Sequence, residues 1–139
     1  MFKMPEEFDT VALSDGGAVM EVEAPNGVVP RGDDGAALMT ITLLGSDSTA
    51  YRKAQNAQLN KRLAKRNVKL TAEELEAETI DTLAACTVGW TGFVGEDGQP
   101  VPCSAKNAAM LYRKYPFIRE QADRFINERQ NFLPKSSAN

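Results

Sequence analysis

The hydrophobic pattern of the chain changes its period near Asp47, and this change constrains the fold more than any other feature. Before that point, Met39, Ile41 and Leu43 alternate with Thr40, Thr42 and Leu44, which is the period of two expected of a half-buried strand. After it, apolar residues recur at the three- and four-residue spacing of helices. The sequence therefore predicts an α+β fold, with a small N-terminal β-hairpin or sheet followed by about four helices.

The N-terminal part, residues 1–46, is expected to form the β element. A strand is predicted over residues 18–23, because a Ser-Asp-Gly-Gly turn precedes it and a Pro-Asn-Gly turn ends it. A second strand is predicted over residues 37–44. Two strands alone are marginally stable, so they need a covering helix or a partner chain.

Residues 47–133 are expected to be helical, and residues 134–139 to form a flexible tail, within one compact domain. The helices are predicted over residues 48–66, 72–89, 105–114 and 116–133. Thr71 and Glu74 have the spacing of a capping box, Ser104 is a good N-cap, and Pro116 suits the first position of a helix.

The first predicted helix is strongly basic and contains no acidic residue. Its basic side chains are Arg52, Lys53, Lys61, Arg62, Lys65 and Arg66. The favoured interpretation is that they face Glu73, Glu74 and Glu76 at the start of the next helix, where exposed pairs contribute roughly 0–1 kcal/mol each. The second interpretation is an electrostatic guide for an acidic partner, and nucleic acid comes third.

The residue types needed for catalysis or for holding a metal are scarce. The chain has no histidine, and its two cysteines, Cys86 and Cys103, do not form a CxxC pair, so neither a zinc site nor a Cys–His pair is expected. Glu96 and Asp97 are adjacent in a Gly- and Pro-rich turn, where a solvated role is expected. We predict no catalytic residue, no metal site and no cofactor, and therefore no enzyme.

Composition bears on compartment and partners. The net charge of −3 argues against a dedicated nucleic-acid binder. The first residues lack the apolar region of a signal peptide, and no apolar run is long enough to span a bilayer. A reducing cytoplasm with free thiols and no membrane contact is therefore expected.

Two groups of large apolar side chains are candidates for binding a partner. Trp90 and Phe93 lie in a glycine-rich segment that matches neither a Walker loop nor a dinucleotide fingerprint. Phe125, Ile126 and Phe132 belong to the stripe of the last helix. These residues fit the core, and any of them that stays exposed can form a groove for an amphipathic helix.

Several segments between residues 39 and 133 together resemble one family, the tail assembly chaperones of long-tailed, siphovirus-type bacteriophages. Residues 83–93 are similar to the family's aliphatic-Val-Gly-Trp-Ser/Thr-Gly signature, and an acidic glycine turn with Pro-x-Pro follows in 96–102. Residues 104–111 resemble its Ser-x-x-Asn-Ala helix start. Residues 116–121 and 125–132 resemble its closing Pro-aromatic-aliphatic-Arg-Glu-Gln and Asn-x-x-x-Asn-Phe segments. Upstream, residues 40–48 and 51–52 are also similar.

This resemblance implies a function. Members of the family bind the long helical tape-measure protein in the cytoplasm of the infected host before the tail tube assembles around it. The expected partner is therefore the tape-measure protein, with the tail tube protein as a second candidate, and a homo-oligomer is left open. A structural component of the virion, in the tail or at the head–tail joint, is the alternative.

Overall fold

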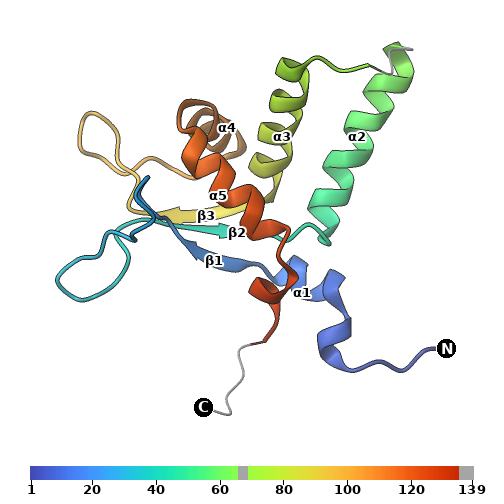
Figure 1. The fold of residues 1–139 in the computed structure, drawn as a ribbon, viewed down its shortest axis with the longest axis horizontal. Coiled ribbons are helices and arrows are strands. Elements are labelled where there is room, and N and C mark those ends of the chain that lie inside the picture. Colours follow the sequence, from blue (N-terminus) through green and yellow to red (C-terminus); the bar gives the residue numbers. More distant parts are fainter. Residues whose placement is uncertain (66–68, 135–139) are drawn as a thin grey trace.

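The computed structural model describes residues 1–65 and 69–134, and it confirms the α+β class (Figure 1). The strands β1 (Ala18–Glu21), β2 (Thr40–Leu43) and β3 (Thr87–Thr91) form one antiparallel sheet in the order β1-β2-β3. The main helices are α2 (Thr49–Lys65), α3 (Ala72–Cys86), α4 (Ala105–Lys114) and α5 (Pro116–Ile126). Shorter elements are η1 (Glu6–Phe8), α1 (Thr10–Gly16) and η2 (Arg129–Phe132).

One face of the sheet carries the core, and the other is open. Ile41 and Leu43 point from β2 into a buried cluster with residues of α3, α4 and α5, and these three helices lie above the sheet in Figure 1. Thr40 and Thr42 alternate with them and face the opposite side. The Thr40 and Thr91 hydroxyls share a hydrogen bond of 2.7 Å there. The predicted period of two in residues 39–44 is thus correct.

The third strand, β3, differs from the prediction. A helix was expected to continue to Gly89, but α3 ends at Cys86 and a strand follows. Thr87 and Val88 are β-branched and favour a strand, and a glycine follows them. The Thr87 hydroxyl donates to the Leu83 carbonyl, and the Leu44 amide donates to the Cys86 carbonyl. The chain therefore passes directly from α3 into β3. A second difference is α1, which occupies part of the segment where only a turn was expected.

The predicted helix caps are present. Thr71 and Glu74 make both hydrogen bonds of a capping box at the start of α3. The Ser104 hydroxyl accepts from the Asn107 amide (3.1 Å), and Pro116 is the first residue of α5. At the start of α2, the Ser48 hydroxyl accepts from the Tyr51 amide (3.1 Å). The local sequence signals thus fixed these helix starts correctly.

A buried pair of hydroxyls joins α4 to the junction between α3 and β3. Tyr112 is fully buried, and its hydroxyl oxygen lies 2.7 Å from that of Thr87. Since the Thr87 proton is used on the Leu83 carbonyl, Tyr112 is the donor of this bond. Burial raises the pKa of Tyr112, so the phenol stays protonated.

Candidate functional site: an aromatic groove beside the third strand

An apolar groove lies at the end of β3, bounded by the loop after that strand and by α4 and the start of α5. Its cavity volume is about 580 Å³. We call it the aromatic groove. Its large apolar lining residues are Met39, Trp90, Phe93, Val94, Val101, Met110, Leu111, Phe117 and Ile118. The sequence had singled out only two of them, Trp90 and Phe93, as partner-binding candidates.

Hydrogen bonds in the loop after β3 hold the aromatic rings in place. The Trp90 indole N–H donates to the Val101 carbonyl (2.8 Å), and the Val101 amide donates to the Phe93 carbonyl (2.9 Å). The Trp90 and Phe93 rings pack at 5.1 Å between centroids. Both rings are half-buried, so one side of each is fixed while part of the other remains available. The two hydrogen bonds and the ring contact therefore define the position of the groove floor.

Gly92 allows this loop to approach the start of β2. Its φ is +85°, and a Cβ atom there would lie 1.9 Å from the Leu38 carbonyl oxygen. No other residue type fits without moving the backbone. The same loop contains Asp97, whose carboxylate accepts from the Gln99 amide (3.0 Å), as expected for a turn residue.

The opposite wall comes from α4 and α5. The side chain amide of Asn107 donates to the Pro102 carbonyl (2.9 Å), which ties the start of α4 to the loop. Met110 is 55% exposed at the rim, and Phe117 is half-buried below it. Met110 could not be identified from the sequence, because it lies off the alanine-rich stripe of its helix. Only the tertiary structure brings these walls together.

The lining determines what the groove can bind. Its surface is mostly hydrocarbon and aromatic ring, and Glu96 and Lys114 place one charge of each sign along it. Methionine side chains adapt to ligands of irregular shape, which suits an apolar stripe more than a small polar substrate. The arrangement is that of a docking surface for the apolar face of a helix or peptide.

The second group of predicted partner-binding residues lies elsewhere. Ile126 and Phe132 are buried in the core, so they offer almost no surface to a partner. Phe125 is half-buried and packs against Phe132 with centroids 5.6 Å apart. None of the three lines the aromatic groove. The structure thus brings Trp90 and Phe93 together but separates them from the last helix's stripe.

The basic residues predicted to guide a partner do not all have the same surroundings. Arg52, Lys53, Lys61 and Lys65 are exposed on α2. Arg62 instead forms an ion pair with Glu78 of α3, and Arg66 lies outside the described residues. Two of the three acids expected to face this helix have other partners: Glu74 caps its own helix, and Glu76 pairs with Arg119. In Figure 1, α2 stands at the opposite end of the sheet from the loop after β3.

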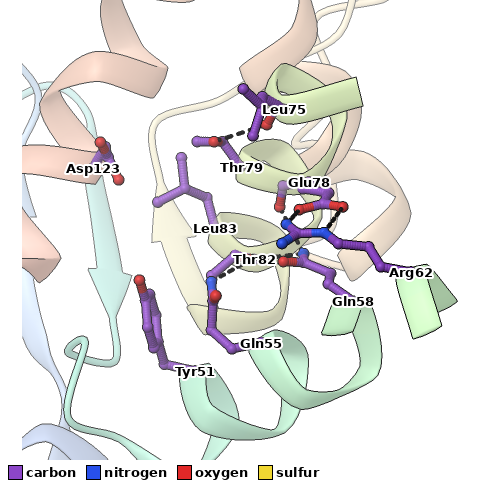
Figure 2. Close-up of a pocket in the computed structure, with 10 residues that line it drawn as sticks. All are labelled: Tyr51, Gln55, Gln58, Arg62, Leu75, Glu78, Thr79, Thr82, Leu83 and Asp123. Carbon is purple, nitrogen blue, oxygen red and sulfur yellow. Dashed lines mark hydrogen bonds and ion pairs between the residues drawn. The ribbon is translucent and has the colours of Figure 1, made fainter. Parts of the chain in front are cut away.

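A smaller cleft of about 190 Å³ separates α2 from α3 (Figure 2). Across it, the Gln58 side chain amide donates to the Glu78 carbonyl and to the Thr82 hydroxyl, each at 2.9 Å. The nearby Arg62–Glu78 pair raises the pKa of the Arg62 guanidinium through its hydrogen bond. These polar groups form hydrogen bonds and an ion pair with one another, so the cleft is part of the packing interface between α2 and α3. Leu59 and Leu63, by contrast, stay exposed on α2.

The remaining candidate features are metal-ligating side chains, thiols and apolar helices in the described part of the chain. Within residues 1–65 and 69–134, no group of three or more His, Cys, Asp or Glu side chains is placed to hold a metal ion. Both cysteines are free thiols, with Cys86 buried and Cys103 partly exposed. No helix among those residues has the length and apolar character needed to cross a membrane.

Comparison with protein-family models, with curated proteins and with solved structures gives no match.

Proposed function

We propose that this protein is a phage tail assembly chaperone that binds the tape-measure protein through the aromatic groove. The observation that carries the proposal is an apolar groove whose aromatic floor is held by hydrogen bonds and whose rim carries the exposed Met110. The sequence resemblance over residues 39–133 supplies the identity of the partner. Such a protein acts in the cytoplasm of the infected bacterial host.

The groove suits the task of protecting a long helical chain. A tape-measure protein exposes apolar stripes before the tube encloses it, and these stripes aggregate unless they are covered. Trp90 and Phe93 provide a fixed floor, while Met110 can adjust to stripes of different sequence. The exposed lysines of α2 act from a separate surface and would speed association with an acidic region of the partner.

The test is co-expression with the tape-measure protein encoded by the same genome. Soluble tape-measure protein and its co-purification are measured for the wild type and for Met110→Glu, which places a charge at the groove rim. Because Met110 is exposed, this change should leave the fold intact. Leu75→Glu is the matched control, since Leu75 is 50% exposed on α3 and lines the α2–α3 cleft instead.

We expect the wild type and Leu75→Glu to keep the tape-measure protein soluble, and Met110→Glu to lose most of this effect. If the wild type has no effect on solubility and forms no complex, the chaperone proposal fails. If Leu75→Glu alone abolishes binding, the partner site lies at the α2–α3 cleft and the groove assignment is wrong.

A structural component of the virion, in the tail or at the head–tail joint, is the second candidate. One observation favours it: both outer strands of the sheet, β1 and β3, present an edge to which a neighbouring subunit's strand could pair. Quantitative proteomics of purified particles separates the two functions. A structural component is present at a fixed ratio to the tube subunit, whereas a chaperone is absent or far below it.

A further inference from the structure

The outer strand β1 has main-chain groups that point away from the sheet. In an antiparallel pair, successive residues turn their N–H and C=O groups alternately toward the neighbour and away from it. The Val22 amide donates to the Met39 carbonyl of the chain leading into β2 (3.0 Å), so Val22 faces the sheet. It follows that Val19, Glu21 and Glu23 turn their main-chain groups outward.

One of these three positions is already occupied by a side chain that imitates a strand. The Gln121 carboxamide of α5 accepts from the Glu23 amide (2.8 Å) and donates to the Glu23 carbonyl (2.7 Å). These are the two bonds that a residue of an added strand would make. Gln121 is only 9% exposed, so this arrangement is fixed. Among the described residues, nothing bonds to the outward main-chain groups of Val19 and Glu21.

A groove runs beside this free edge, between β1 and the outer side of α5, with a cavity volume of about 620 Å³. We call it the edge groove. Val19, 59% exposed, forms its strand side, and Phe125 forms an apolar wall held by Phe132. It is distinct from the aromatic groove, with which it shares no lining residue. The edge groove therefore lies beside the unpaired main-chain groups of Val19 and Glu21.

We propose that the edge groove binds an extended basic peptide segment of a partner protein, which adds to β1 as a fourth strand. The carboxylates decide the chemistry of this segment. Glu21 is paired with Arg31 (3.0 Å), so the remaining charged side chains that line the groove are Glu23, Glu128 and Arg124, two carboxylates against a single guanidinium. A complementary segment carries lysine or arginine toward these carboxylates and an apolar side chain toward Phe125.

The same charges argue against other occupants. Neither β1 nor β3 contains a lysine or an arginine, so a second copy of this chain pairing through either strand would leave the carboxylates unmatched. Pairing β1 with a second β1 would also bring a second copy of Glu21 to the groove, and like charges oppose that arrangement. Nucleic acid is disfavoured for the same reason.

The test uses two short acetylated peptides, one alternating valine with lysine and the other alternating valine with glutamate. Amide hydrogen exchange of the full chain is followed by NMR at Val19, Glu21 and, for comparison, Val88 on the opposite edge. We expect the lysine peptide to slow exchange at Val19 and Glu21 several-fold and in a saturable manner, with no change at Val88. The glutamate peptide should have no such effect.

Two matched variants sharpen the test. Val19→Pro removes one outward N–H from β1 without removing a bond to β2, and Val88→Pro, at the irregularity of the β2–β3 register where Val88 is 56% exposed, is the comparison on the opposite edge. Only Val19→Pro should abolish the slowing at Glu21. Glu128→Lys changes an exposed groove side chain, so it keeps the fold and should reduce the preference for the lysine peptide.

The proposal is overturned if neither peptide slows exchange at β1, if both do so equally, or if the slowing appears at Val88 instead. It is also overturned if β1 is protected without peptide in a concentration-dependent dimer, because the occupant is then a second copy. None of these results depends on the tape-measure protein, so this inference and the chaperone proposal can fail separately.

Discussion

The hydroxyl pair of Tyr112 and Thr87 provides the most direct test of how α4 is held against the sheet. Tyr112→Phe removes a donor, while Thr87 can still donate to the Leu83 carbonyl, so the loss should be about 0.5–1.5 kcal/mol of unfolding free energy. Thr87→Val removes the oxygen that accepts the Tyr112 hydrogen bond, so the buried Tyr112 hydroxyl is left without a hydrogen-bond acceptor. This unsatisfied hydroxyl lowers the free energy of unfolding by about 1–3 kcal/mol, in addition to the effect of losing the Thr87 bond to the Leu83 carbonyl.

Thr87→Val should therefore destabilise the protein more than Tyr112→Phe. The double variant has no unsatisfied hydroxyl at this site. Its loss of unfolding free energy should therefore be smaller than the sum of the two single losses, by about 1 kcal/mol. Equilibrium unfolding in urea measures all three, with the fluorescence of the single tryptophan, Trp90, as the signal. Thr79→Val is the control, because the Thr79 hydroxyl also bonds a carbonyl one helical turn earlier but at an exposed site.

The reasoning is refuted if Thr87→Val costs no more than Tyr112→Phe, or if the two losses add. A large loss in Thr79→Val would show that the effect comes from losing the threonine bond to the carbonyl four residues earlier, and not from leaving a buried hydroxyl without an acceptor. A positive result would confirm that the α4 wall of the aromatic groove is fixed to β3 by this bond.

Three further predictions follow from other sites. Gly92→Ala should be much more destabilising than Gly98→Ala in urea unfolding, because both have positive φ but only Gly92 would bring a Cβ onto Leu38, and Gly98→Ala should cost roughly 1–2 kcal/mol. The hydrogen bond from Arg129 lowers the pKa of Asp47, so this carboxylate stabilises the fold above its unfolded pKa of about 3.9 and loses that contribution as pH falls through the lower folded value. Asp47→Asn should thus lower stability at neutral pH by at most about 1 kcal/mol, since Arg129 is exposed, and the difference from wild type should vanish in acid. Burial raises the pKa of the Cys86 thiol to about 11, so a thiol reagent at mildly alkaline pH should modify Cys103 first and reach Cys86 only in denaturant.

The parts of the fold that could be predicted are those governed by local chemistry. Thr71, Ser104 and Pro116 each start a helix through bonds or dihedral angles within a few residues, and the sequence places them correctly. The alternation in β2 is equally local. The strand β3 was missed because Leu83, Thr87 and Trp90 continue the helical spacing, although two β-branched residues before a glycine were a signal for its start.

The candidate site could be predicted only in part, because its walls come from segments far apart in the sequence. Trp90 and Phe93 were identified by their size and setting, whereas Met39, Met110 and Phe117 join them only through the packing of α4 and α5 on the sheet. Gln121 interrupts an apolar stripe, and that interruption was the only sequence sign of its role at the β1 edge. Whether a large apolar residue is buried, as Ile126 is, depends on the same long-range packing.

The order of elements also has a consequence for folding kinetics. The strands β2 and β3 are neighbours, yet the whole of residues 44–86, including α2 and α3, lies between them in the chain. Closing so long a connection is slow unless local structure shortens it first. The contacts between α2 and α3 are close in sequence, so this helical hairpin can form early and deliver β3 to β2. We therefore expect Gln58→Ala, which weakens the hairpin, to slow folding more than it speeds unfolding.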